Sequence, residues 1–500
     1  MADRYQPLVR YFQKLSRIEH AITFLQWDHM VMMPPRGSEA RSKALAELSA
    51  TYHRRLVSDE LGELLQEVED KTDNPERIAS IREMKKVYSR AVCLSSDLVE
   101  AKTIAGARCE YQWRQQRNDN DWDGFAGNFR EVVKLCREEA QARFARNPDN
   151  FATPYDTLLD LHCTGDDSGF IQAVFTRLKR DLPGILEQVL ERQRETKRPN
   201  LAGEYPVAQQ QQLNKNLMLS LGFDFESGRL DVSAHPFSTG CRGDQRITTR
   251  YRENDFFDSL LATAHETGHA SYENGLPRQY DGLPVGGARN LCLHESQSLL
   301  FEKQLLLTRP FLEFFLPVIH RCLPATSHLS AETLWLGATR VAPSLIRVEA
   351  DEATYPFHVI IRFEIERDLI NQQIEIDDIP ELWDEKMRRY LGISTGSNFK
   401  DGCMQDMHWT DGSFGYFPSY TMGAINSAQF SAAIRLAHPD WQEQLAGGNL
   451  DFIRRWLLEN IWSVGSTIES QEILQKATGQ KTNPDFFLDH LKTRYLDCGY

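Results

Sequence analysis

The segment from Asp255 to Gly275 constrains the fold more than any other part of the chain, because its pattern predicts a helix and the direction of its polar side chains. Apolar residues recur at three- and four-residue steps over its first half, which predicts an amphipathic helix with one buried face. Asp255 or Asn254 can cap the start of this helix, and Gly275 followed by Pro277 can end it. The helix is therefore expected to pack against other elements.

Two histidines of this helix point in the same direction. His265 and His269 are four residues apart, so on a helix they lie one turn apart and can bind one divalent metal ion, most often zinc. Glu266 lies beside them, where a carboxylate can accept a proton from a water molecule at the metal. A chance match would usually lie on a solvated face, whereas this helix is amphipathic and small residues flank the motif. The pattern predicts a metal-dependent hydrolase.

A third metal ligand is expected from a second helix that begins near Arg289. Glu295 follows His269 by 26 residues, and the intervening GLPRQYDGLPVGG can turn the chain so that the two helices pack together. Two histidines and one glutamate leave a coordination position open, as a catalytic zinc site requires. The alternatives are that Glu295 is a surface carboxylate or that His294 is the ligand. His294 points about 100° away on the same helix, so only one of them can face the metal.

Composition indicates a soluble globular chain and disfavours several kinds of partner. The chain has 500 residues, of which 41% are hydrophobic and 26% charged, and its net charge of −14 argues against nucleic acid and anionic membranes. Its nine cysteines form no C-x-x-C pair, which predicts reduced thiols. The charged N-terminus and the lack of 18 consecutive apolar residues predict no signal peptide and no membrane span. A cytoplasmic location is expected.

The periodicity predicts a chain that is helical on both sides of a small sheet. Helices are expected over most of residues 1–222, with one from 75 to 117 and another from 122 to 146, and an interruption at Trp27-Asp28. Residues 223–253 read as two or three strands, one of which could bind an extended peptide. Helices return from 254 to 500, including one or two over 332–373. Residues 394–423 are rich in Gly, His and aromatic residues and predict a long functional loop.

Six short motifs occur in an order that is typical of one protein family. They are His235-Pro236-Phe237, Asp244-x-Arg246-x-Thr248, His265-Glu266-x-x-His269, His294-Glu295-Ser296-Gln297, Ile346-Arg347-x-x-Ala350-Asp351 and Gly402-x-x-Gln405-Asp406-x-His408-Trp409. Through these motifs the chain resembles the carboxypeptidase Taq family, metallopeptidase family thirty-two, over essentially its whole length. Residue spacing by itself indicates only a metal-dependent hydrolase.

The resemblance implies a mainly α, two-lobed helical metallopeptidase fold with a deep central groove and a small antiparallel β-sheet next to the metal helix. It implies one catalytic domain, with 1–222 forming one side of the groove, 223–253 the sheet, and 254–500 the metal-binding and C-terminal helices. It also implies a homodimer that binds Zn²⁺ or Co²⁺ and removes single residues from the C-termini of peptides. The alternatives are a metal-dependent endo-oligopeptidase on a similar scaffold and a non-catalytic interaction protein.

The resemblance also suggests roles in the reaction. It implies that His265, His269 and Glu295 hold the metal and that Glu266 is the general base. The oxyanion of the intermediate needs a donor, for which Tyr420, Tyr416 and His408 are candidates. Tyr420 is favoured, because related helical zinc peptidases have a histidine and a tyrosine at similar spacing. The alternative is that the tyrosines only pack in a rigid loop.

An exopeptidase must bind a free carboxylate, for which arginine is best suited. Arg347 is the candidate, although an ion pair with Asp351 on one helix face is the alternative. Arg246 is the rival arginine, and its alternative is a structural pair with Asp244. His235 is expected either to line the groove or to be a turn histidine.

Three further residues are expected to support the metal site. Gln405 and Asp406 could orient a metal-binding imidazole, and so could Ser298, one turn after Glu295.

Overall fold

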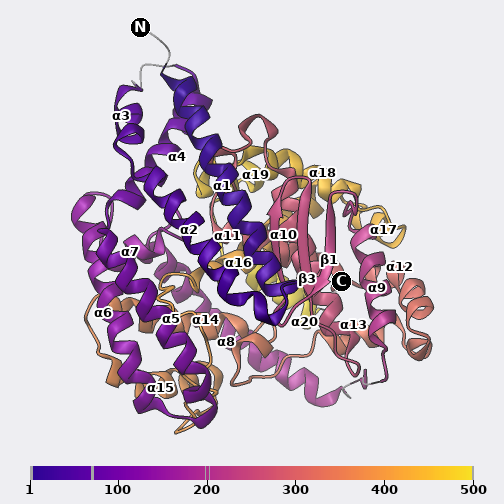
Figure 1. The fold of residues 1–500 in the computed structure, drawn as a ribbon. Helices are drawn as coiled ribbons and strands as arrows, with labels where there is room; N and C mark the ends of the chain where they lie inside the picture. Colours follow the sequence, from indigo (N-terminus) through magenta and orange to yellow (C-terminus); the bar gives the residue numbers. More distant parts are fainter. Residues whose placement is uncertain (1–3, 69–72, 197–198, 202, 498–500) are drawn as a thin grey trace.

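The computed structural model describes residues 4–68, 73–196, 199–201 and 203–497. It confirms the mainly helical fold (Figure 1). The helices before the sheet are α1 (Tyr5–Val31), α2 (Ser38–Leu56), α3 (Asp59–Glu67), α4 (Pro75–Val92), α5 (Ser96–Asp119), α6 (Trp122–Arg146), α7 (Pro154–Leu159), α8 (Ser168–Glu195) and α9 (Val207–Ser220). Within these described ranges, no helix before or after the sheet is long and apolar enough to cross a membrane.

Two predicted boundaries in this part are wrong. The first helix continues through Trp27, whose side chain is only 5% exposed and lies on the buried face of α1. The helix predicted over 75–117 is broken between α4 and α5, because Ser95 caps a new helix by accepting a hydrogen bond from the N–H of Leu98. The helix predicted over 122–146 is confirmed as α6.

The small sheet contains β1 (Gly228–Val232), β2 (Phe237–Cys241) and β3 (Asp244–Thr249) in the order β1-β3-β2. β2 and β3 form an antiparallel hairpin, but β1 pairs parallel to β3, so the predicted antiparallel sheet is in fact mixed. The reason is topological. The chain leaves β1 through a short turn and skips one strand position, and the hairpin then brings β3 into that position. Helix α1 lies against β2 at the edge of this sheet.

The helices after the sheet carry the predicted metal ligands. They are α10 (Phe256–Gly275), α11 (Leu291–Leu299), α12 (Arg309–Cys322), α13 (Ala331–Ala338), α14 (Tyr355–Ile370), α15 (Ile379–Leu391), α16 (Pro418–Ala437), α17 (Trp441–Ala446), α18 (Asp451–Asn460), α19 (Ser470–Thr478) and α20 (Asp485–Tyr495). The α-helix α11 continues into a π-helix, η4 (Leu300–Leu306). Asp255 caps α10 as predicted, through the N–H groups of Phe257 and Asp258.

Two further predictions need correction. The segment 332–373 is not one or two continuous long helices, because residues 340–354 between α13 and α14 are largely irregular and contain only the short 3-10 helix η6 (Arg347–Glu349). The loop predicted over 394–423 ends earlier, because Pro418 starts α16. Tyr420 therefore lies in the first turn of a helix.

The candidate site lies between two large apolar cores. One core combines α5–α8 with α14, α15 and α20, and the other combines α9–α13 with α18 and α19. Helices α11 and α16 contribute residues to both, and Figure 1 shows them near the centre of the molecule with α10. A third, smaller core joins α1, α3 and α4 to the segment around Leu283. The predicted ligands thus lie on helices that are packed from both sides.

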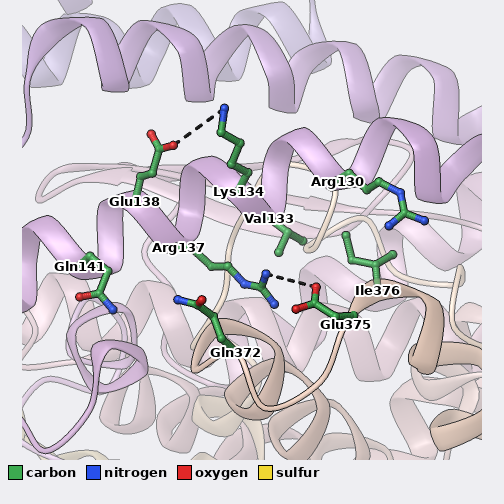
Figure 2. Close-up of a pocket in the computed structure, with 9 residues that line it drawn as sticks. All are labelled: Arg130, Val133, Lys134, Arg137, Glu138, Gln141, Gln372, Glu375 and Ile376. Atoms are coloured by element: carbon green, nitrogen blue, oxygen red, sulfur yellow. Dashed lines mark hydrogen bonds and ion pairs between the residues drawn. The ribbon is translucent and has the colours of Figure 1, made fainter.

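A depression of about 590 Å³ lies on α6 and the segment before α15 (Figure 2). Its basic residues have carboxylate partners, because Arg137 pairs with Glu375 and Lys134 with Glu138, and Arg130 pairs with Asp377 outside the depression. No residue of the predicted site lines it. We assign it no role.

Candidate active site

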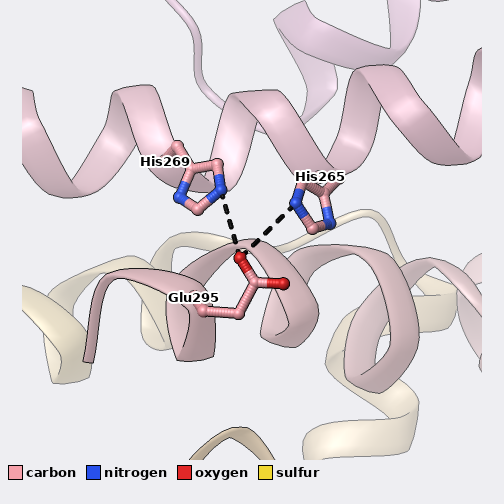
Figure 3. A group of neighbouring side chains, drawn as sticks. All are labelled: His265, His269 and Glu295. Carbon is pink, nitrogen blue, oxygen red and sulfur yellow. Dashed lines mark ion pairs between the residues drawn. The ribbon is translucent and has the colours of Figure 1, made fainter. Parts of the chain in front are cut away.

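The structure brings the three predicted metal ligands together (Figure 3). Oε2 of Glu295 lies 3.5 Å from Nε2 of His269 and 3.8 Å from Nε2 of His265. Ligand atoms at about 2.1 Å from a tetrahedral ion are about 3.4 Å apart, so the three donors fit one such ion. They are the only group of three described His, Cys, Asp or Glu residues with their ligand atoms within 4.8 Å of one another. The residues present therefore suit a divalent metal.

Two glycines let the helices approach closely enough to form this group. A Cβ atom on Gly268 would lie 2.5 Å from the backbone oxygen of Gln297, so α10 and α11 can meet only at a glycine. A Cβ atom on Gly423 would lie 2.7 Å from Cβ and Cγ of Glu295, so the same holds for α16 and α11. The ligand group depends on these two contacts between helices.

We expect Gly268→Ala to weaken metal binding by about tenfold or more, because the added methyl group separates Glu295 from the two histidines. Overpacking should also destabilise the fold by about 1–3 kcal/mol. Competition with a chelator gives the affinity, and calorimetry gives the stability. The matched control is Gly184→Ala in α8, where an added Cβ meets no atom within 4 Å. Equal metal affinities in the two variants would contradict this explanation.

Glu266 is a buried carboxyl next to the ligand group. Only 7% of the surface of Glu266 is exposed to solvent. Burial raises the pKa of Glu266 to about 7; the nearby His265 opposes this shift, and Glu295 adds to it. A carboxyl with such a pKa can both accept and return a proton near neutral pH.

Arg347 lies in the 3-10 helix η6, so it does not form the helix-surface ion pair with Asp351 that was the alternative to binding a carboxylate. Asp351 accepts hydrogen bonds from the N–H groups of Ala342 and Thr354 instead. Nε and Nη2 of Arg347 both lie 2.9 Å from Oδ1 of Asp406, and Nη1 donates to the hydroxyl of Tyr355 at 2.6 Å. Arg347 is therefore a buried, well-oriented guanidinium.

The cluster around Arg347 has one more positive than negative charge. Asp406 also accepts from Nε of Arg362 at 2.6 Å, so two guanidinium groups share one carboxylate. Burial lowers the pKa of His358 to about 3 and that of His408 to about 4, with help from the arginines, so both rings are neutral. No second carboxylate pairs with either arginine in the described chain. The cluster is suited to bind one anion.

One cavity of about 280 Å³ joins this cluster to the ligand group. It is lined by His265, Glu295, Arg347, Tyr355 and Tyr420, by the charged residues Glu302, Lys303 and Glu352, and by further polar and apolar side chains. A molecule in this cavity can contact His265, Glu295 and the guanidinium of Arg347 at the same time.

Residues 7–495 match the family described as Carboxypeptidase Taq (M32) metallopeptidase. This chain belongs to that family. It is 34% identical to Thermostable carboxypeptidase 1 of Thermus thermophilus, with 98% of each chain covered, and 30% identical to Carboxypeptidase 1 of Bacillus subtilis, with 97% of each covered. Among solved structures it is similar to Trypanosoma cruzi metallocarboxypeptidase 1, with 37% identity, 99% of each chain covered and a TM-score of 0.96.

In this member of the carboxypeptidase Taq family, the Nδ1 atoms of His265 and His269 both have partners. Nδ1 of His265 lies 2.9 Å from Glu302, and Nδ1 of His269 lies 2.7 Å from Nδ1 of His294. Nε2 of His294 in turn lies 2.8 Å from Glu273. If both Nε2 atoms are kept free for a metal, each Nδ1 carries the proton and donates it to its partner. His294 is thus placed to support His269 and is not part of the ligand group.

Sequence reasoning missed Glu302 and Glu273, and it assigned the wrong supports. Gln405 accepts from the N–H of Arg347 and donates to the carbonyl of Leu345, and Asp406 binds two arginines, so neither orients an imidazole. The hydroxyl of Ser298 contacts Glu295 rather than an imidazole. It donates to the backbone oxygen of Glu295 at 2.7 Å and lies 3.3 Å from the Glu295 carboxylate. The sequence did contain a signal for Glu302. It follows Glu295 by seven residues, and residues at this spacing share a helix face, which places Glu302 on the side of the ligand group.

The three candidate oxyanion donors lie together. The hydroxyl of Tyr420 is 3.2 Å from Nε2 of His408, and the rings of Tyr416 and Tyr420 are 5.3 Å apart. Burial raises the pKa of Tyr416 to about 12 and that of Tyr420 well above its usual value, so both phenols stay protonated. Only Tyr420 of the three lines the cavity that holds Arg347 and Glu295.

The remaining candidates lie at the sheet. Arg246 pairs with Asp244, with Nη2 at 2.9 Å from Oδ2, and its guanidinium lies 4.4 Å from the ring centre of Trp27. This is the structural pair that the sequence suggested as the alternative. His235 is exposed in the turn between β1 and β2. Neither residue lines the cavity with Arg347.

Proposed function

We propose how this metallocarboxypeptidase, a peptide hydrolase, binds and cleaves its substrate. His265, His269 and Glu295 hold one divalent metal ion, and Arg347 binds the free carboxylate at the C-terminus of the peptide. Glu266 is the general base, and Tyr420 donates a hydrogen bond to the developing oxyanion, with His408 behind it. The enzyme then releases single residues from the C-terminus.

The observation that supports this proposal most is the unbalanced positive charge beside the ligand group. Arg347 and Arg362 share only Asp406, and Arg347 lines the same cavity as His265 and Glu295. A substrate carboxylate would balance the charge, and arginine can bind it through two parallel hydrogen bonds. A peptide with a blocked C-terminus would leave the charge unbalanced, which argues against an endo-oligopeptidase.

The proposed mechanism assigns a proton path to this chain's own residues. When bound, the divalent ion polarises the scissile carbonyl and lowers the pKa of water. Glu266 accepts the proton of the attacking water and returns it to the leaving amine. The hydroxyl of Tyr420 donates to the oxygen on which negative charge develops, and Arg347 fixes the terminal residue.

We propose Zn²⁺ as the ion, with Co²⁺ as a substitute. Two imidazoles and one carboxylate form a set that zinc binds in hydrolytic sites. The partners of both Nδ1 atoms support this proposal, because they keep each Nε2 directed at the ion.

We propose further that the enzyme is a cytoplasmic homodimer and one catalytic domain of two lobes. The eight described cysteines are free, which suits a reducing compartment. The dimer and the lobes rest on the family resemblance. Tyr416, His235 and Arg246 stay candidates for substrate contacts further along the groove.

Metal removal tests the proposed chemistry. Purified protein loaded with Zn²⁺ should shorten a peptide one residue at a time from its C-terminus, as followed by mass spectrometry. A chelator should stop the reaction, and added Zn²⁺ or Co²⁺ should restore it, because the ion is needed to polarise the carbonyl. Undiminished cleavage in the metal-free protein would contradict the proposed metal site.

A further inference from the structure

The support of His265 extends to the C-terminal helix α20 through buried charged groups. Glu302 accepts from His265 through Oε2, and its Oε1 lies 2.6 Å from Nζ of Lys303. Both residues belong to the π-helix η4. Such helices are rare and are frequently found at functional sites.

Arg494 of α20 contacts the backbone of this π-helix. Its side chain is completely buried, and Nη2 donates to the backbone oxygen of Lys303. Nη1 of Arg494 also lies 2.6 Å from Oε1 of Glu352, a side chain that is 8% exposed in the turn before α14. The hydroxyl of Tyr495 donates to the same oxygen at 2.9 Å. Arg494 therefore connects the backbone of η4 with a second buried carboxylate.

Charge balance links the two carboxylates. Glu302, Lys303 and Glu352 all line the cavity at the ligand group. Lys303 and Arg494 balance Glu302 and Glu352, so each carboxylate keeps one cation. Burial opposes the ammonium form of Lys303, but Glu302 and Glu352 together raise its pKa. Without Arg494, both carboxylates would compete for Lys303, and Glu302 would be held less firmly against His265.

We infer that Arg494 and Glu352 are positioning residues of the metal site, which act on His265 through Lys303 and Glu302. The C-terminal helix is then part of the catalytic machinery, although it contributes no ligand and no proton. The inference rests on the proposed ligand set, in which Nε2 of His265 faces the metal and Nδ1 donates to Glu302. It predicts that a change in α20 alters the affinity of the site for metal.

The test measures the affinity for Zn²⁺ by competition with a chromophoric chelator, which does not depend on peptide cleavage. Arg494→Met should lower the affinity by about tenfold, the lower end of the range for partners of metal ligands. The visible spectrum of the Co²⁺-loaded variant should change as well, because the imidazole is less well fixed. Failure of peptide cleavage in wild-type protein that binds Zn²⁺ would count against the proposed function alone.

A double-mutant cycle separates this effect from a general loss of stability. In the Glu302→Gln background, Arg494→Met should cause no further loss of affinity, because the connection is already broken. The control is Lys386→Met, which removes one cation from Glu364, another buried carboxylate, 2.7 Å away and outside the cavity. It should lower the melting temperature and leave the Zn²⁺ affinity unchanged.

Tyr495→Phe provides a milder variant if Arg494→Met folds poorly. It removes one hydrogen bond to the Glu352 carboxylate with almost no change in volume. The affinity should fall about two- to threefold, less than in Arg494→Met, because Glu352 keeps Arg494 as its partner. The inference is overturned if Arg494→Met and Tyr495→Phe bind Zn²⁺ like the wild type. It is also overturned if the effects of Arg494→Met and Glu302→Gln on affinity are additive.

Discussion

Glu266→Gln is expected to lower kcat by about 10²–10⁴-fold, the usual contribution of a general base. The amide has the shape of the carboxyl but accepts no proton from water and returns none to the leaving amine. Steady-state and single-turnover kinetics on a peptide with a free C-terminus would measure the loss of kcat. KM should change little, because Glu266 is not expected to bind the substrate.

The control for this prediction is the metal content of the same variant. Glu266 is not one of the three grouped ligands, so Glu266→Gln should retain one Zn²⁺ per chain. A variant that has lost its metal would explain lost activity without a base. A variant that holds the metal and keeps wild-type kcat would show that another group takes the proton.

Arg347→Met is expected to lower kcat/KM for peptides with a free C-terminus by about 10- to 150-fold. This corresponds to about 1.5–3 kcal/mol for hydrogen bonds to a charged group. The loss should be largest in KM if the carboxylate is bound equally in the ground and transition states. Steady-state kinetics on one peptide series would measure it.

Two comparisons separate the loss of carboxylate binding from misfolding and from a simple loss of positive charge. Asp406 keeps Arg362 as a partner in the variant, so the carboxylate is not left alone and the fold should persist. Arg347→Lys keeps the charge and loses the planar geometry, so its kcat/KM should fall between those of the wild type and Arg347→Met. If Arg347→Met binds peptides as well as the wild type, the terminal carboxylate is bound elsewhere.

The parts of the site that lie within one helix could be predicted from the sequence. His265, Glu266 and His269 lie within five residues, and their helix has a clear apolar face and a cap at Asp255. Local periodicity is enough to give their relative directions. Glu295 could be predicted as well, because a short turn-forming segment permits only a nearby return helix.

The parts that depend on distant contacts could not be predicted in the same way. Asp406 lies 59 residues after Arg347, and it reaches Arg347 and Arg362 only because its loop folds back on α14. The spacing of Arg347 and Asp351 suggested a helix instead. The parallel pairing of β1 with β3 has the same origin, because strand order depends on how the hairpin is inserted and not on the pattern within each strand.

The most direct test of the account uses one peptide in two forms that differ only in a C-terminal amide. The Zn²⁺-loaded enzyme should remove single residues from the free acid and leave the amide uncut, with Glu266→Gln as the inactive reference. This result would require that the enzyme recognises the free carboxylate, as expected from a cavity lined by Arg347, His265 and Glu295. Equal cleavage of both peptides, or cuts at internal bonds, would contradict the role of Arg347 and the assignment as a carboxypeptidase.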